Sequence, residues 1–452
     1  MKSILFVIPW STYFLEHPTA PFADEPERAP EGVVGLATYL QHYGVKVAVA
    51  DLQLELRKGG SRQAALDRLF AVCADFAPEI ISFSFHTRRF ENAIDVFKSL
   101  TAWYSRSALP HPFLTAGGIH CTLLPGITMR YMAFDALVIG EGEIPLLRLC
   151  RGERPEDIRG FWFEGQEEKT GAEVVEDMDD MPFPDWTLID KDFYCQPSHM
   201  ISRGLLHRVM PISFSRSCVH DCRFCAHSCF YKYRHHSAEC FIRKIEHQAA
   251  LCGVSHFILQ DSSIGNAPKV WSEVCRELIR RDAPYKWWAN LRANQCTEDF
   301  VTLMRDAGCI KLFFGFESGS QRMLDRMNKR ITVEQCVAAA EVCHKVGMPF
   351  YASFIVNYFG EEEQDLELTE RLIQATRPTT VAINKFAPNP GSADFYTALP
   401  GLQPLLHDAH GWTRLGAWHS PRLYCNMTEE RFRYWFDRLL TLRREINSHE
   451  DS

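Results

Sequence analysis

Three cysteines, Cys218, Cys222 and Cys225, lie close together in the stretch 213–233, separated by three and then by two residues. Thiols this near in sequence cannot all pair with one another as disulfides, but their thiolates can converge on one inorganic centre from a single loop. Iron–sulfur clusters are held by cysteine thiolates. Three thiolates on a cubane cluster would leave one iron open, and an open metal position is where chemistry takes place. The spacing therefore predicts a catalytic metal centre rather than a purely structural one.

Two other kinds of metal protein have to be weighed against this interpretation. Cys229 extends the run to four thiols, as in ferredoxin-type electron-transfer proteins, but those runs place a proline after the last cysteine and here the residue is Phe230. A zinc site is the second alternative, because four histidines lie in or near the stretch: His220, His227, His235 and His236. Zinc sites usually pair two knuckles that are well apart in sequence, however, and this stretch has one dense knot of cysteines.

The spacing, together with the aromatic Phe224 just before the last cysteine, resembles the cluster motif of the radical SAM superfamily. The resemblance implies a [4Fe-4S] cluster held by Cys218, Cys222 and Cys225, whose open iron binds the amino and carboxylate groups of S-adenosylmethionine (SAM). It implies further that one electron from the cluster splits SAM into methionine and a 5'-deoxyadenosyl radical. A flavodoxin- or ferredoxin-type protein is then expected to donate the electron.

Composition places the chain among ordinary globular proteins. At 452 residues it is long enough for two or three domains, and 46% of its residues are hydrophobic and 23% are charged. The net charge of -8 argues against general nucleic-acid binding, which needs a basic surface. No stretch reads as a membrane span, and the N-terminus lacks the cleavage site of a signal peptide. With sixteen cysteines, the sequence therefore predicts a location in the reducing cytoplasm.

Residues 1–150 alternate short apolar runs with helical patterns, which predicts an α/β domain with a Rossmann-like, doubly wound parallel sheet. Sheets of this kind bind their ligands at the carboxyl ends of the strands. Strands are expected at 3–9, 46–51, 79–84, 113–117 and 136–139, and helices at 32–43, 61–76 and 91–105.

Glycines follow two of these strands, in the sequences GGIH at 117–120 and GEGE at 140–143. Together they resemble the cobalamin-binding domain of the B12-type radical SAM subfamily. One position departs from those domains that supply a lower axial histidine, because Gln53 stands where the histidine is expected. We therefore expect either that cobalamin binds without a protein ligand or that the domain keeps the fold without the cofactor. The missing histidine favours the second.

A linker and a second domain follow. Residues 151–205 carry prolines and acidic residues with few apolar runs, which is typical of a solvated linker. Residues 206–400 repeat strand, loop and helix, which predicts a partial (β/α)6 barrel of the TIM type with its active site at the carboxyl ends of the strands. The cysteines then follow the first barrel strand. Strands are expected at 210–217, 256–261, 287–294, 311–318, 350–358 and 380–386, and a C-terminal helical extension at 401–452.

Polar residues end five of the barrel strands in phase, which marks a pocket at this end of the barrel. By the resemblance, four of them correspond to SAM-contacting positions, Asp261, Arg292, Glu317 and Ser318, with Phe224 near the adenine. An arginine can bind a carboxylate through two hydrogen bonds, and a carboxylate can accept from ribose hydroxyls. The alternative is that Arg292 and Glu317 pair with each other as a structural ion pair inside the barrel.

Four further strand-end residues are candidate catalytic groups by position alone: Asn290, Asn357, Tyr358 and Lys385. A dehydration would need one group to act as a base and another to act as an acid. The glycine-rich turn that is usual in the subfamily is altered at Asn357 and Tyr358. This change predicts substrate contacts at those two residues or a simple substitution in a surface turn.

These features predict an enzyme that abstracts a hydrogen atom from a small polar, sugar-like substrate. The missing axial histidine and the polar strand ends favour dehydration of the substrate, similar to the radical SAM diol-dehydratases of apramycin, an aminoglycoside antibiotic, with a separate reductase acting on the product. The alternative is a cobalamin-dependent radical SAM C-methyltransferase, which is the more common role in the subfamily. No nucleic-acid or membrane partner is expected.

Overall fold

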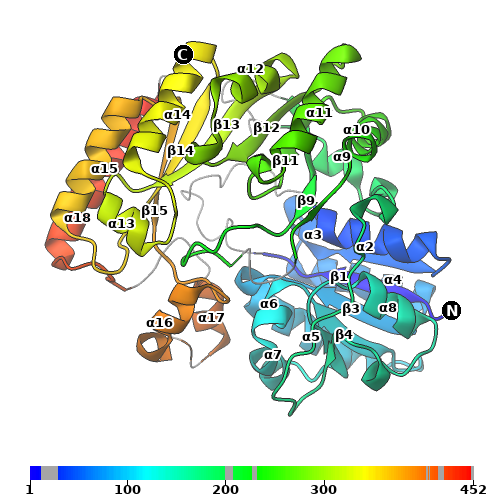
Figure 1. The fold of residues 1–452 in the computed structure, drawn as a ribbon. Helices are drawn as coiled ribbons and strands as arrows, with labels where there is room; N and C mark the ends of the chain where they lie inside the picture. The colour runs from blue at the N-terminus through cyan, green and yellow to red at the C-terminus, as the bar shows by residue number, and fades with distance from the viewer. Residues whose placement is uncertain are drawn as a thin grey trace. The chain divides into compact units, whose positions relative to one another are not determined.

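The structure is a computed structural model that describes residues 1–11, 29–198, 207–226, 232–403, 406, 408–415 and 422–448. The chain divides into two compact units, both drawn in Figure 1. Unit 1 holds the described residues up to Phe193 together with those of Tyr396–Gly416, and unit 2 holds those of Tyr194–Phe395 and Ala417–Ser452. None of the described helices combines the length and the apolar character that a bilayer span requires.

Unit 1 is built on a parallel sheet, as the alternation of apolar runs and helical patterns predicts. β1 (Ile4–Ile8) is buried along its whole length, because helices cover both faces of such a sheet. It pairs with two neighbours, so that Ile4 lies opposite both Val47 and Ile80. The strand order is β2-β1-β3-β4-β5-β6, and only the last strand is antiparallel to its neighbour. The other strands are β2 (Val47–Asp51), β3 (Ile80–Ser84), β4 (Phe113–Gly117), β5 (Ala136–Val138) and β6 (Phe161–Trp162).

Helices connect these strands and contact one another in pairs, α2 with α8 and α4 with α5. The chain segment after the barrel also adds one helix to unit 1, α17 (Ala409–Leu415), which contacts α5 and the short helix η1 (Thr87–Arg89). In this contact Glu91 N donates to Thr413 Oγ1 at 3.1 Å. The other helices are α2 (Glu31–His42), α3 (Leu52–Arg57), α4 (Arg62–Phe76), α5 (Phe90–Tyr104), α6 (Ile119–Leu123), α7 (Pro125–Tyr131) and α8 (Glu143–Cys150).

Unit 2 is the expected partial barrel, a curled sheet of six parallel strands in the order β15-β14-β13-β12-β11-β8, with a short antiparallel strand, β7 (Pro197–Ser198), beside β8. Figure 1 shows helices lying outside this sheet. The strands are β8 (His207–Ile212), β11 (His256–Leu259), β12 (Lys286–Leu291), β13 (Cys309–Glu317), β14 (Phe350–Val356) and β15 (Thr380–Lys385). The helices are α10 (Ala238–Cys252), α11 (Pro268–Arg280), α12 (Glu298–Asp306), α13 (Gln321–Arg326), α14 (Val333–Val346), α15 (Glu363–Thr376) and α18 (Glu429–Ser448).

Local sequence signals explain where several of these helices begin and end. The side chain of Thr332, which precedes α14, accepts from Gln335 N at 3.2 Å, and the Gln335 side chain accepts from Thr332 N in return. α14 then ends at Gly347, whose φ of +73° is the left-handed conformation that favours glycine at a helix end. α10 follows the same plan, with Ser237 before it and Gly253 after it. These connections fix the ends of the strands that carry the site.

Two expected boundaries differ in the structure. Unit 1 does not end at residue 150, because β6 pairs antiparallel with β5 and the compact unit runs on to Phe193. The expected linker 151–205 is therefore largely part of unit 1. The expected C-terminal extension 401–452 is also divided: its first described residues, up to Leu415, belong to unit 1, and α18 packs against β15 in unit 2. A strand of two residues has no periodicity from which the sequence could predict it.

Candidate active site

The three cysteines lie in the loop after β8 and the two-residue strand β9 (Ser215–Arg216), at the carboxyl end of the barrel. We call residues 217–226 the cluster loop. Cys222 is buried, and Cys218 and Cys225 are half-buried. Cys225 N donates to Cys222 O at 3.1 Å, which closes the turn between these two residues. The loop thus follows the first barrel strand, as the sequence predicts.

Hydrogen bonds hold the chain that enters the cluster loop and a residue within the loop. Before it, the carboxylate of Asp261 accepts from Phe214 N at 2.9 Å and from Ser215 N at 2.6 Å. Within it, Arg223 N donates to Met327 O at 2.9 Å. Asp261 was expected to contact SAM; in the structure its two oxygens orient the chain that enters the cluster loop.

Two side chains present N–H groups to the cysteine sulfurs. Arg292 Nη1 lies 3.6 Å from Cys222 Sγ, and Asn266 Nδ2 lies 3.8 Å from Cys218 Sγ. Burial lowers the pKa of His220, in the same loop, to about 4, and the positive charges of Arg292 and Lys329 add to this effect. Hydrogen bonds to the cysteine sulfurs are among the interactions that proteins make around iron–sulfur clusters. The surroundings therefore suit cysteines that bind an iron–sulfur cluster.

The spacing of the sulfurs bears on the zinc alternative. Two thiolates on one zinc ion lie at most about 4.6 Å apart, because each Zn–S bond is about 2.3 Å long. In the part of the chain that the structure describes, Cys218, Cys222 and Cys225 do not form a group whose sulfurs all lie within 4.8 Å of one another. A cubane binds each thiolate at a separate corner and so needs a wider arrangement. The donor set therefore fits a cluster better than a single zinc ion.

Arg292 and Glu317 do not form the structural ion pair that was the alternative to SAM binding. Glu317 pairs with Lys329 and not with Arg292: Lys329 Nζ donates to Glu317 Oε1 at 2.7 Å, and both side chains are at least nine-tenths buried. Arg292 Nη2 donates instead to the carbonyl oxygen of Lys329. Lys329 Nζ also lies 5.7 Å from the centre of the Phe224 ring. Lys329 is thus a member of the site that the sequence analysis missed.

A bulge near the end of β13 makes room for this pair. The strand register shifts between Gly315 and Glu317, and Glu317 has a φ of +66°, which is unusual for a residue other than glycine. A Cβ at position 315 would lie 2.2 Å from Glu317 Oε1 and 2.9 Å from Lys329 Nζ. Gly315 is therefore the signal in the sequence that a buried group approaches the strand here.

Three other predicted SAM contacts differ in their surroundings. Arg292 is buried, and its Nε has no hydrogen-bond partner among the described residues, so one donor is left for a ligand. The Phe224 ring packs against an apolar cluster formed by Met323, Met327, Tyr358 and Phe386. Ser318 is fully buried, and its Oγ lies 3.4 Å from Thr369 Oγ1 of α15. Arg292 has the geometry expected of a ligand contact, whereas Ser318 lies against a helix.

Two candidate catalytic residues are bound to other parts of the chain. Asn357 Nδ2 donates to Arg422 O at 2.8 Å, and its Oδ1 accepts from Tyr424 N at 2.8 Å. Tyr358 is buried and its hydroxyl donates to Asp394. These contacts join β14 to later segments of unit 2, and they favour structural roles for both residues.

The other two candidates lie on opposite sides of the sheet. Asn290 Nδ2 donates to Asp261 O at 2.6 Å, beside the chain that leads into the cluster loop. Lys385 Nζ lies 4.5 Å from the centre of the Phe436 ring of α18, outside the barrel. Asn290 is the candidate that the geometry supports better, and a catalytic role for either residue stays a prediction.

Unit 1 offers a second candidate site, at the carboxyl edge of its sheet. In the order β2-β1-β3-β4-β5 the sequence of strands runs outward from β1 to β2 on one side and from β3 to β5 on the other. Doubly wound sheets bind ligands at such a switch point, here between β1 and β3. Gly118, after β4, has a φ of +94°, and a Cβ there would lie 2.8 Å from Phe85 O. Glycine thus lets the segments after β3 and β4 approach closely. The edge therefore has the topology that a cobalamin domain requires.

Gln53, at the position expected for an axial histidine, is part of the core of unit 1. The residue is buried in α3, and its Oε1 accepts from Ser11 N. His120 is also buried, with Nδ1 3.1 Å from Thr87 Oγ1 and its ring stacked on Phe90 at 4.2 Å. Burial lowers the pKa of His120 to about 3. Both side chains thus stabilise the fold around the edge.

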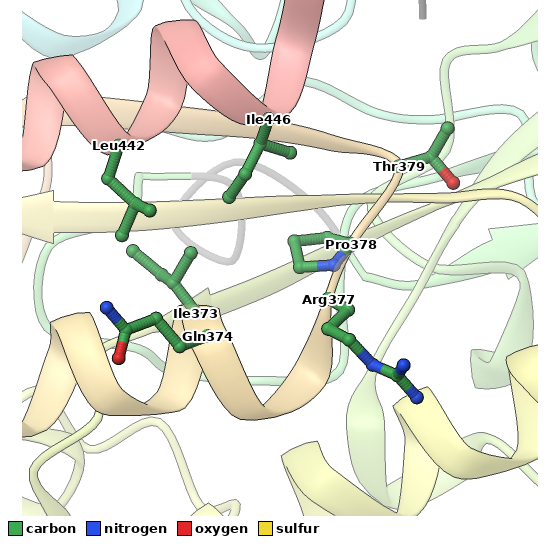
Figure 2. A pocket seen from close by; sticks show the side chains of 7 residues that line it. All are labelled: Ile373, Gln374, Arg377, Pro378, Thr379, Leu442 and Ile446. Carbon is green, nitrogen blue, oxygen red and sulfur yellow. The ribbon is translucent and has the colours of Figure 1, made fainter. Parts of the chain in front are cut away.

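A hollow of about 380 Å³ lies at the other end of the barrel (Figure 2). It is bounded by the end of α15, the start of β15 and the last turns of α18, with Ile373, Leu442 and Ile446 among its apolar side chains. Thr379, also in its wall, precedes β15, so the hollow lies at the amino end of that strand. Active sites of barrels lie at the carboxyl ends of the strands. The hollow is therefore separate from the cluster loop.

Two family models match the chain and agree with this division. The model described as the radical SAM superfamily matches residues 212–373, which include the cluster loop and most of the barrel. The model described as the B12 binding domain matches residues 28–149, which make up most of unit 1. The predicted architecture is therefore confirmed.

Two curated relatives and one solved structure extend these matches. The chain is 30% identical over 307 residues to an anaerobic magnesium-protoporphyrin IX monomethyl ester cyclase of Rubrivivax gelatinosus, an alignment that covers 65% of this chain and 54% of the relative. It is 25% identical over 304 residues to the "uncharacterized methyltransferase PH0819" of Pyrococcus horikoshii, covering 65% and 63%. The chain thus spans less than two thirds of the length of each relative.

The solved structure is the radical SAM methyltransferase TsrM from Kitasatospora setae, described with cobalamin and a [4Fe-4S] cluster bound. It matches with a TM-score of 0.68 over 89% of this chain and 75% of its own, at 16% identity. At this identity the likeness shows the fold alone. The two family models show that the chain combines a radical SAM domain, matched over residues 212–373, with an N-terminal B12-binding domain, matched over residues 28–149.

Proposed function

We propose that the chain is a cobalamin-dependent radical SAM methyltransferase. The observation that carries the proposal is the presence of a B12-binding domain and a radical SAM domain in one chain. The name of the Pyrococcus relative and the description of the Kitasatospora structure also refer to methyl transfer. Methylation thereby replaces dehydration as the favoured reaction, and the B12-binding domain is proposed to hold its cofactor.

In the barrel, Cys218, Cys222 and Cys225 would hold the cluster, which supplies the electron for SAM cleavage. Arg292 is proposed to bind the SAM carboxylate, because its Nε has no partner in the described chain and its Nη1 lies 3.6 Å from Cys222 Sγ. A hydrogen bond between a guanidinium and a carboxylate is charge-assisted and therefore stronger than one between neutral groups. Glu317, whose position is fixed by Lys329, remains the candidate for the ribose hydroxyls.

In unit 1, the carboxyl edge of the sheet between β1 and β3 is the proposed cobalamin site. Cobalamin supplies a methyl carrier when it is bound there. The Gln53 side chain is already bound to Ser11 N, so we expect no axial ligand from position 53. Gly118 provides the close backbone approach at the neighbouring strand end.

A small polar substrate and a flavodoxin- or ferredoxin-type electron donor complete the proposal. Asn290 lies one residue before the end of β12 and offers an amide group, and Glu317, paired with Lys329, ends β13. A substrate with hydroxyl or amide groups could hydrogen-bond to such groups. A separate reductase would be needed only if the product were a ketone, as after dehydration.

The proposal is tested by anaerobic incubation of the reconstituted protein with reductant, cobalamin and SAM that carries a deuterated methyl group, using a cell extract as the source of substrate. Mass analysis of the products should show a new compound that carries the labelled methyl group. Protein reconstituted without cobalamin should cleave SAM to 5'-deoxyadenosine but give no labelled product. A product that has lost water, formed equally well without cobalamin, would reject methylation in favour of dehydration.

A further inference from the structure

Asp394, at the start of α16 (Ala393–Leu402), is a buried residue that contacts the cluster loop. Its Oδ1 accepts from Arg223 Nε at 3.1 Å, and its backbone N donates to Arg223 O at 3.0 Å. Arg223 stands between Cys222 and Phe224 in the sequence. One acidic residue, distant in the sequence, thus binds both the side chain and the backbone of the cluster loop.

The two partners differ in exposure, and this difference shows which one fixes the other. The Asp394 side chain is 2% exposed, whereas that of Arg223 is 44% exposed. A buried carboxylate without a partner costs far more free energy than a solvated guanidinium does. Asp394 therefore requires the arginine beside it, and the loop that carries Arg223 is held where the pair can form.

Tyr358 fixes the second oxygen of the carboxylate. Its hydroxyl donates to Asp394 Oδ2, and its ring is buried in the apolar cluster against which Phe224 packs. Tyr358 therefore acts on the cluster loop in two ways: its hydroxyl binds Asp394, which binds Arg223, and its ring belongs to the apolar cluster against which Phe224 packs. Removing the hydroxyl would affect the first route and leave the ring packing in place.

We propose that Asp394 is a positioning residue for the iron–sulfur cluster. Through Arg223 and Tyr358 it fixes the second half of the cluster loop, so that Cys225 and Phe224 keep the arrangement that the cluster and SAM require. Asp394 acts through Arg223 and is not itself a ligand. The inference rests on the radical SAM assignment of this unit and is independent of whether the enzyme methylates its substrate.

The test compares Asp394→Asn with Asp221→Asn. Asp221 lies in the same loop and pairs with Arg330 at 2.9 Å, but both of those side chains are about 60% exposed. Each protein is reconstituted anaerobically, and three quantities are measured: iron and sulfide per chain, the electron paramagnetic resonance (EPR) spectrum of the reduced cluster with and without SAM, and the dissociation constant of SAM.

Asp394→Asn should weaken SAM binding, or lower iron content, by about 10- to 100-fold, the range typical for residues that orient metal ligands. Its reduced cluster should also show a smaller change in the EPR spectrum when SAM is added. Asp221→Asn should match the wild type in all three quantities. Tyr358→Phe should fall between the two, because Asp394 keeps its bond to Arg223.

Wild-type iron content, EPR spectra and SAM affinity in Asp394→Asn would overturn the proposal. If Asp394→Asn does not fold, Arg223→Gln removes the same ion pair by changing its more exposed partner. The same changes in iron content, EPR spectrum and SAM affinity are then expected of Arg223→Gln. None of these measurements depends on product formation. A failure of the methyltransferase proposal would therefore leave them unchanged.

Discussion

Lys329 Nζ lies 2.7 Å from Glu317 Oε1 in a part of the barrel where both side chains are at least nine-tenths buried. The pair is joined to the cluster loop through Arg292, which contacts both the Lys329 carbonyl and Cys222 Sγ. A buried ion pair is stabilising only while both partners are present, because an unpaired buried charge is costly. This property leads to a direct test of the pair.

Lys329→Met should lower the free energy of unfolding by about 3–5 kcal/mol, because it leaves Glu317 buried without a counter-charge. The double variant Lys329→Met/Glu317→Gln should recover most of that loss, since no charge then remains. Chemical unfolding of the apo-protein measures both values. If the single and double variants are equally unstable, the pair does not have the energetic role that the structure indicates.

Gly315→Ala tests whether the absence of a side chain at this position of β13 is needed to place the Glu317–Lys329 pair. The added Cβ would meet Glu317 Oε1 at 2.2 Å and Lys329 Nζ at 2.9 Å, so the pair has to move. We expect SAM affinity to fall, by about tenfold as for other residues that orient a bound group. Gly35→Ala in α2 serves as a control for the glycine change, because the backbone there is helical and nothing lies within 4 Å of the added Cβ. A SAM dissociation constant unchanged by Gly315→Ala would argue against Glu317 as a SAM contact.

The cluster ligands are tested one at a time. Cys218→Ala, Cys222→Ala and Cys225→Ala should each abolish SAM cleavage and lower the iron content, because a cubane that loses one of three thiolates is no longer held. Cys229→Ala should keep both, since three thiolates suffice and the fourth iron has to stay open for SAM. Iron analysis and release of 5'-deoxyadenosine are the measurements. Loss of the cluster in Cys229→Ala would support a ferredoxin-type centre instead.

The sequence predicts the parallel strands of both units well because their physical signals are local. β1 is a continuous apolar run, and β3 and β14 are mostly apolar, as expected of strands with both faces covered. The place of the three cysteines, in the loop after the first barrel strand, was also predictable, since their spacing within one loop is itself the signal. What these features share is that a short stretch of chain is enough to specify them.

Contacts between residues that are distant in the sequence were not predictable in this way. Lys329 follows Glu317 by a helix and a turn, and Asp394 lies far beyond Arg223, so no spacing rule links either pair. The alternation of side chains along a strand, in contrast, could have indicated from the sequence that Lys385 faces away from the barrel interior. Successive residues of a strand point to opposite faces, so Asn384 and Lys385 cannot both face the barrel interior. In the structure Asn384 Nδ2 binds Ser353 Oγ at 2.9 Å, and Lys385 faces α18.

His120 makes unit 1 sensitive to acid. Burial lowers its pKa from 6.5 to about 3, so between these values the unfolded chain binds a proton that the folded chain does not. Above pH 6.5 the titration of His120 therefore does not reduce the free energy of unfolding. As the pH falls below 6.5, this free energy decreases by up to about 1.4 kcal/mol per pH unit. His120→Leu should lose less stability than the wild type between pH 7 and pH 5, as measured by thermal unfolding. Thr87→Val, which removes only the hydrogen-bond partner of His120, should keep the wild-type pH dependence.

Glu361 should have the opposite effect in unit 2. It is fully buried, its Oε2 accepts from Asn357 N at 2.7 Å, and its Oε1 has no partner among the described residues. Burial raises its pKa from 4.5 to about 8. The folded protein therefore holds a proton that the unfolded chain has released between these values. The stability that this proton provides is present below pH 4.5 and is lost as the pH rises through 8.

Glu361→Gln carries no titratable group but keeps an oxygen for Asn357 N. Its stability relative to the wild type should therefore increase between pH 6 and pH 9, because only the wild type has to ionise a buried carboxyl or remain protonated at a cost. Urea unfolding at several pH values measures this difference, with Glu367→Gln as the control, because the Glu367 side chain on α15 is 46% exposed. A constant difference across the range would mean that Glu361 is already ionised in the folded protein.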